Sequence, residues 1–154
     1  MSESNEKQKK QMSELDVHKS LLKGVAGLNI GEAIAYIVGV ILVFVSSDPA
    51  KYAKGFFSVT EEDLTEGISL ETMCAVTGIF MAIIAIVMAV LIFKGLKPGS
   101  KAIVAVEIIA WVSLIGSIIY IIVGETSLSM TASIAIDSMT CTAADFVRKS
   151  YKQQ

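Results

Sequence analysis

Long apolar segments separated by short polar ones dominate the pattern of this chain. A helix needs about 20 mainly apolar residues to cross the hydrocarbon of a bilayer. Three segments meet this requirement, at residues 25–45, 73–93 and 102–123. Because backbone polar groups find no water in lipid, we expect each segment to form an α-helix that spans the membrane.

A fourth candidate span, residues 127–147, is more polar. It is rich in Ser, Thr and Ala, and Asp137 lies at its centre. Its hydropathy also allows an interfacial helix or a soluble tail. Its polar residues recur on one helical face, however, and its apolar residues recur on the opposite face. Such a helix is stable in a bilayer when its polar face packs against other helices.

The distribution of Lys and Arg distinguishes three spans from four, because short basic segments stay in the cytoplasm. Five of these residues precede the first span, two lie in the first loop, three lie between the second and third spans, and three follow the fourth. Four spans place eleven inside and two outside, whereas three spans give eight and five. We therefore predict an all-α integral membrane four-helix bundle, with three apolar spans, a polar fourth span, and cytoplasmic N- and C-termini.

The polar segments complete the predicted organisation. Residues 1–24 are expected to form a cytoplasmic polar tail before an uncleaved signal-anchor. Residues 25–147 form the four-span membrane domain. Within this domain, residues 46–72 are an acidic outer loop with a net charge of −4. Pro98 and Gly99 predict a tight turn. Residues 148–154 form a basic cytoplasmic tail.

Small residues recur every three or four positions along the predicted spans. The first span carries Gly27, Gly31, Ala35 and Gly39, and the second carries Gly78, Ala82, Ala85 and Ala89. Helices in lipid associate through close packing of small residues and through hydrogen bonds. We expect these rows of small residues, or seams, to let the helices of one chain pack together. The same surfaces would equally allow packing against a second copy of the chain, as a homo-oligomer, or against a partner membrane protein.

Composition narrows the possible functions. Hydrophobic residues make up 53 % of the chain and charged residues only 18 %, against about 25 % in soluble domains. The net charge of −2 offers no basic surface to a nucleic acid. His18, expected in a solvated tail, is the only imidazole, and the chain has two cysteines. We therefore expect no metal site, no catalytic residues, no cofactor and no enzymatic activity.

Three acids that lie at least one helical turn from either end of a predicted span are the candidate site residues: Glu32, Glu107 and Asp137. At 1.5 Å per residue, Glu32 lies roughly 10 Å and Glu107 roughly 8 Å from the cytoplasmic end of its helix, and Asp137 lies near the midplane. A charged group at the centre of a membrane helix is unfavourable by about 2.5–3.5 kcal/mol. Two interpretations follow: an intramembrane cation or proton site, or protonated acids that donate hydrogen bonds between helices.

These observations favour a small multi-pass protein of the cell membrane, with the lipid bilayer as its first partner. We expect a non-catalytic interaction, regulatory or accessory subunit that acts through its helix faces and its acidic loop. The alternative is a small proton- or cation-coupled transporter or channel that uses the intramembrane carboxylates. The two differ in whether Glu32, Glu107 and Asp137 converge on a wet cavity or take part in separate helix contacts.

Overall fold

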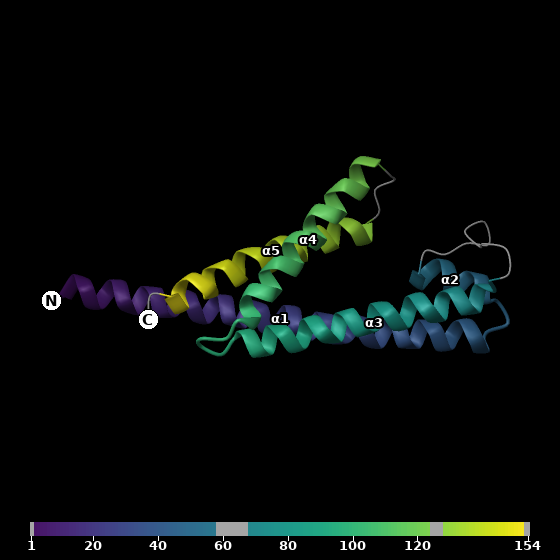
Figure 1. Ribbon diagram of the computed structural model, residues 1–154, viewed down its shortest axis with the longest axis horizontal. Helices are drawn as coiled ribbons and strands as arrows, with labels where there is room; N and C mark the ends of the chain where they lie inside the picture. The colour runs from purple at the N-terminus through teal and green to yellow at the C-terminus, as the bar shows by residue number, and fades with distance from the viewer. Residues whose placement is uncertain (1, 58–67, 124–127, 153–154) are drawn as a thin grey trace. The chain divides into compact units, whose positions relative to one another are not determined.

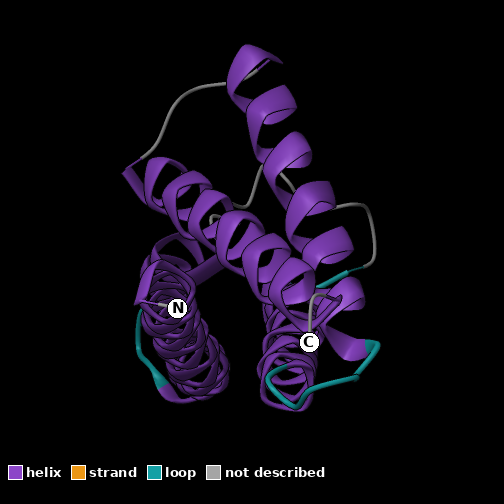
Figure 2. Cartoon of the chain, turned by 90° about the vertical axis from the view of Figure 1, so that its left-hand side faces the viewer, coloured by secondary structure: helices purple, strands orange, loops and turns teal. Residues whose placement is uncertain are grey.

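The chain is helical throughout the ranges that the computed structural model describes, which are residues 2–57, 68–123 and 128–152. Within these ranges there are five helices and no strand (Figure 2). In chain order they are α1 (Ser2–Val45), α2 (Pro49–Phe57), α3 (Leu70–Gly95), α4 (Ala102–Val123) and α5 (Leu128–Lys152), as labelled in Figure 1. The prediction of an all-α chain is confirmed for these residues.

Three of these helices are long and apolar enough to cross a membrane. The qualifying segments are Met12–Val45 of α1, Leu70–Gly95, which is the whole of α3, and Ala102–Ile119 of α4. They contain, or overlap closely, the three apolar spans predicted from the sequence. Among the helices described, α5 does not reach the same hydropathy, because Ser, Thr and charged residues are distributed along it. The structure thus supports a membrane protein with three candidate spans.

The segments predicted as polar tails are helical where the structure describes them. The helix α1 has 44 residues and begins at Ser2, so residues 2–24 belong to the same helix as the first span. At 1.5 Å per residue this helix is about 66 Å long, roughly twice the thickness of the hydrocarbon core. Likewise, α5 continues to Lys152, beyond the expected end of the fourth span at residue 147. Both basic ends are therefore helical extensions.

The chain divides into two compact units. One unit is Gly27–Ala89, and the other combines Met1–Ala26 with Val90–Gln154. The boundary runs through both α1 and α3, so each of these helices contributes to the two units.

Small side chains let the helices of the unit Gly27–Ala89 approach closely. Ala33 of α1 is buried with Ala82 and Ala85 of α3, beside Tyr36. A second cluster joins α1, α2 and α3 through Val43, Ala53 and Cys74. Apolar side chains packed against this cluster are Tyr52, Phe57, Leu70 and Met73. The short helix α2 lies in the segment that the sequence predicts only as an acidic loop, whose residues 58–67 lie outside the described ranges.

Two glycines show how close this packing is. A methyl group added to Gly39 would lie 2.7 Å from Cγ of Phe56. One added to Gly78 would overlap Val40 and lie 2.8 Å from Cε1 of Phe57. Within the same unit, no atom lies within 4 Å of the corresponding position at Gly27 or Gly31. The small-residue seam predicted on the first span is therefore packed at Gly39 and open within its unit at Gly27 and Gly31.

An antiparallel pair formed by α4 and α5 makes up most of the other unit (Figure 1). Ala110 and Leu114 of α4 are buried with Cys141 of α5, and Ile134 packs against them. Before this pair, the predicted turn after α3 is present: Gly99 adopts φ +76°, a conformation that a side chain disfavours. The backbone amide of Ala102 donates to Oγ of Ser100, which caps the start of α4.

The C-terminal end of α5 lies beside the turn between α3 and α4. The hydroxyl of Tyr151 donates a hydrogen bond to the carbonyl of Leu96. Nζ of Lys19 lies 5.2 Å from the centre of the Tyr151 ring, within range of a cation–π contact. The ring of His18 stacks on Phe146 with 4.1 Å between their centres. His18 was expected in a solvated tail; instead it is half-buried because α5 extends far enough to cover it.

Candidate functional site between α4 and α5

The site begins with Glu107, which lies one and a half turns into α4. Its neighbours Val106 and Ala110 are fully buried, so this part of the helix faces into the unit. The Glu107 side chain is only 15 % exposed. A carboxylate removed from water in this way needs a partner of opposite charge or a proton.

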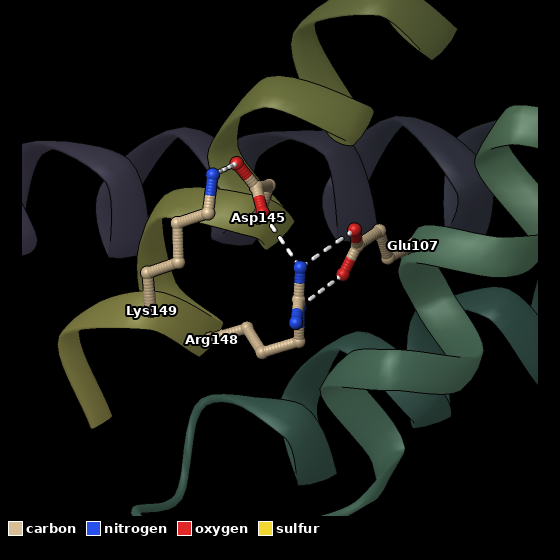
Figure 3. A network of polar contacts seen from close by, with 4 residues as sticks. All are labelled: Glu107, Asp145, Arg148 and Lys149. Carbon is tan, nitrogen blue, oxygen red and sulfur yellow. Dashed lines mark hydrogen bonds and ion pairs between the residues drawn. The ribbon is translucent and has the colours of Figure 1, made fainter. Parts of the chain in front are cut away.

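Arg148 of α5 supplies that partner. Its Nε donates to Oε2 of Glu107 at 2.6 Å, and one Nη donates to Oε1 of the same group at 3.2 Å (Figure 3). Two parallel hydrogen bonds from a planar guanidinium to a carboxylate form the strongest common geometry for such a pair. The hydrogen bonds and charge of Glu107 raise the pKa of Arg148 further above its ordinary value. Glu107 and Arg148 are therefore an ion pair that joins two helices.

Asp145 extends this pair into a network of four residues (Figure 3). The Nη of Arg148 that contacts Glu107 also donates to Oδ1 of Asp145 at 2.7 Å. Nζ of Lys149 donates to Oδ2 of Asp145 at 2.6 Å. The Lys149 side chain is 64 % exposed and the Arg148 side chain 25 %. Two acids and two bases thus neutralise each other, and their side chains become more exposed from Glu107 to Lys149.

Asp137 contacts α4 through a separate hydrogen bond. The hydroxyl of Ser113 donates to its Oδ2 at 2.7 Å. This contact is almost two helical turns along α4 from Glu107. Nearby, the hydroxyl of Thr140 donates to the carbonyl of Ile136 in its own helix. Asp137 is a site residue predicted from the sequence, and its partner Ser113 was not predicted.

Glu32 belongs to the other unit, Gly27–Ala89. It is exposed, and its Oε1 accepts a hydrogen bond from the hydroxyl of Tyr36, one turn later in α1, at 3.0 Å. The Tyr36 ring in turn stacks on Phe57 with 6.2 Å between their centres. Of the three predicted site residues, the structure thus brings Glu107 and Asp137 to one helix pair, with different partners.

Sequence reasoning missed Arg148 and Asp145 because both lie at the end of the polar segment, 41 and 38 residues after Glu107. A signal was nevertheless present. In an antiparallel pair, residues at equal distances from the connection face each other. Residue 107 lies sixteen positions before the end of α4, and residue 144 lies sixteen positions after the start of α5, so these two positions are opposite. Arg148 is one helical turn further along. The register of the hairpin therefore indicates an arginine within reach of this acid.

A cavity of about 470 Å³ lies beside the ion-pair network, in the groove between α4 and α5. The residues that line it are Glu107, Trp111, Leu114, Ser138, Cys141, Thr142 and Asp145. In the part of the chain that the structure describes, no group of three or more His, Cys, Asp or Glu side chains is arranged to hold a metal ion. The site therefore consists of a polar network and an adjoining mixed cavity.

Comparison with protein families, with curated proteins and with solved structures gives no match for this chain.

Proposed function

We propose that the protein is a four-span protein of the cell membrane with both termini in the cytoplasm. The antiparallel pairing of α4 and α5 supports this topology. If α4 leaves the cytoplasmic side, α5 returns toward it, and the contact of Tyr151 with Leu96 holds the end of α5 beside the turn from which α4 starts. The charge count agrees, since the basic parts of the chain are the N-terminal part of α1, the turn between α3 and α4, and the C-terminal end of α5.

We further propose that the protein is a non-catalytic interaction, regulatory or accessory subunit. One observation carries this proposal: each acid of the predicted spans accepts a hydrogen bond from a side chain of the same protein. The donors are Tyr36 for Glu32, Arg148 for Glu107, and Ser113 for Asp137. The bonds to Glu107 and Asp137 join α4 to α5, whereas the bond to Glu32 lies within α1. A cation- or proton-coupled transporter needs carboxylates that exchange their ligand during each cycle.

The exposed surface of α4 supports a role in association within the membrane. Large apolar side chains are exposed on the side of this helix opposite its buried residues, which is typical of a helix that faces lipid or other membrane helices. They are Val104, Ile108, Ile109, Trp111, Val112, Ile115, Ile118, Ile119 and Ile122. A second copy of the chain or another membrane protein could bind this surface through packing alone.

The experiment that tests this proposal compares flux and association in the same preparation. The purified full-length protein is reconstituted in liposomes, and proton and potassium flux are followed with entrapped indicators. We expect flux equal to that of protein-free liposomes, and crosslinking in native membranes that yields a defined complex. Flux that is present in the wild type and lost in Asp137→Asn or Glu107→Gln would contradict the proposal and support the transporter alternative.

A further inference from the structure

The cavity between α4 and α5 is lined by a single face of each helix. Glu107, Trp111 and Leu114 follow one another at intervals of four and three residues, as expected for one side of α4. Ser138, Cys141, Thr142 and Asp145 occupy one side of α5 in the same way. The cavity therefore follows the groove of the helix pair over about two turns, which is roughly 10 Å.

Polarity changes along this groove. Glu107 and Asp145 lie at the end nearest the turn before α4 and the C-terminal end of α5. Leu114 and Ser138 lie at the other end, deeper along the apolar part of α4. Beyond the cavity, Ile118 continues the same face of α4 and is exposed. A ligand that fits this arrangement has a polar end and an apolar end.

The polar end of the cavity presents carboxylate oxygens, whose charge Arg148 and Lys149 balance. Its lining includes two carboxylates and neither Lys nor Arg, because Arg148 and Lys149 contact these carboxylates from outside the lining. A carboxylate has about four acceptor positions, and the hydrogen bonds described above use two on Glu107 and two on Asp145. Each acid therefore keeps the capacity to accept hydrogen bonds from, or to attract, a cationic group in the cavity.

Trp111 makes an organic cation the best match. Its side chain lines the cavity and the residue is 49 % exposed. Indole is the aromatic group that attracts ammonium groups most strongly, and quaternary ammonium groups are commonly recognised by aromatic rings. The volume of about 470 Å³ also lies in the range of small-molecule sites, about 300–1,000 Å³. Leu114 and Cys141 contribute apolar surface that a hydrated metal ion would not use.

We propose that this cavity binds the ammonium end of a zwitterionic phospholipid headgroup. The ammonium lies against Trp111 and beside the carboxylates of Glu107 and Asp145, on the side that faces the cavity and not the side that Arg148 contacts. The phosphate then lies at the mouth of the cavity, where Lys149 is exposed, and the acyl chains follow the exposed apolar face of α4. The network of two acids and two bases matches a headgroup that also carries one charge of each sign.

The test uses full-length protein in a mild maltoside detergent and native mass spectrometry to count bound lipids. Three lipids with identical acyl chains are offered, with choline, ethanolamine or glycerol headgroups. We expect the two ammonium lipids to be retained at least about fivefold more than the glycerol lipid. Trp111, the only tryptophan of the chain, gives a second readout, because its emission shifts when the cavity is occupied.

Two variants locate the site, with a matched control. Ser138→Leu fills the cavity, and Trp111→Leu removes its aromatic surface. We expect each substitution to reduce the retention of the ammonium lipids to the level of the glycerol lipid. Ser117→Leu makes the same change as Ser138→Leu on α4, outside the cavity, and is expected to retain them. Helix content measured by circular dichroism verifies that each variant is folded.

Three results would overturn the proposal. The first is equal retention of the three lipids by the wild type. The second is undiminished headgroup preference in both folded cavity variants. The third is a shift of Trp111 emission with glycerophosphocholine at the same concentration as with the complete lipid, which would assign the cavity to a soluble ammonium compound.

Discussion

The two compact units of this protein are stabilised in different ways. In the unit Gly27–Ala89, α1, α2 and α3 meet through glycine, alanine and aromatic rings, as at Gly78 against Phe57. In the other unit, α4 and α5 are joined by an arginine–carboxylate pair and by the bond from Ser113 to Asp137. Packing of small residues requires only that two smooth surfaces meet. A polar contact requires one particular partner, and it therefore also determines the register of the helices.

The largest effect is expected at the ion pair between α4 and α5. In Arg148→Met, the carboxylate of Glu107 loses both its hydrogen bonds and its counter-charge in a position with little access to water. Breaking one side of such a pair is more harmful than removing both sides. We expect Arg148→Met to lower the thermal midpoint more than any other variant described here, and Glu107→Gln combined with Arg148→Met to recover part of the loss.

This double-mutant cycle is measured as the thermal midpoint of unfolding in detergent, with circular dichroism as the readout. The matched control is Lys149→Met, on the same turn of α5. If Arg148→Met and Lys149→Met had equal effects, or if the double variant were no more stable than Arg148→Met, the pair would not hold the two helices together.

The next effect is expected where the other unit is most closely packed. Gly78→Ala adds a methyl group that overlaps Val40 and the Phe57 ring. We expect this overpacking to reduce the free energy of unfolding by about 1–3 kcal/mol. Gly31→Ala places the same group in open space on α1, and its expected effect is neutral or stabilising by up to about 1 kcal/mol because alanine favours helix. Effects of the same sign and size at both positions would contradict the packing described.

A smaller effect is expected at Asp137. Ser113→Ala removes the hydroxyl that donates to its carboxylate, and hydrogen bonds between membrane helices contribute roughly 0.6–1.7 kcal/mol. Ser117→Ala, one turn further along α4, is the matched control and is expected to change the free energy of unfolding by much less. Equal effects of the two variants in equilibrium unfolding would show that the Ser113 contact does not stabilise the hairpin.

The smallest effect is expected at the surface of the network. Lys149 is mostly exposed, and its contact with Asp145 spans one turn of the same helix. Pairs of this kind contribute about 0.5 kcal/mol or less and weaken with salt. We therefore expect Lys149→Met to lower stability slightly at low ionic strength and not at all in 1 M salt. A loss that persists in high salt would indicate that Lys149 has a further role.

The sequence predicts the length of the spanning helices and the residues that share a helix face, but not which helix packs against that face. Apolar segments of about 20 residues predict spanning helices because the bilayer sets their length, and Val45 is indeed a helix end. The predicted seam at Gly39 and Gly78 is packed, whereas at Gly27 it is open within its unit. Periodicity shows which side chains share a face, but it does not show which helix covers that face.

The parts that escaped prediction depend on contacts between distant positions. Hydropathy ends the fourth span before Arg148, although this residue belongs to the same helix and reaches back to Glu107. The polar segment 1–24 contains too few apolar residues to be read as a span, yet Leu15 and Leu22 are buried. His18 is half-buried because Phe146 covers it. A pattern confined to one segment cannot indicate that another segment will cover it.

The central claim is that α5 returns the chain to the cytoplasmic side, where its end meets the turn before α4. Cysteine labelling of intact cells tests this claim most directly, in a background with Cys74→Ala and Cys141→Ala. With a membrane-impermeant maleimide, we expect Ser47→Cys to react in intact cells, and Lys97→Cys and Lys152→Cys to react only after permeabilisation. Labelling of Lys152→Cys in intact cells, with Lys97→Cys still protected, would place the two on opposite sides and contradict the account.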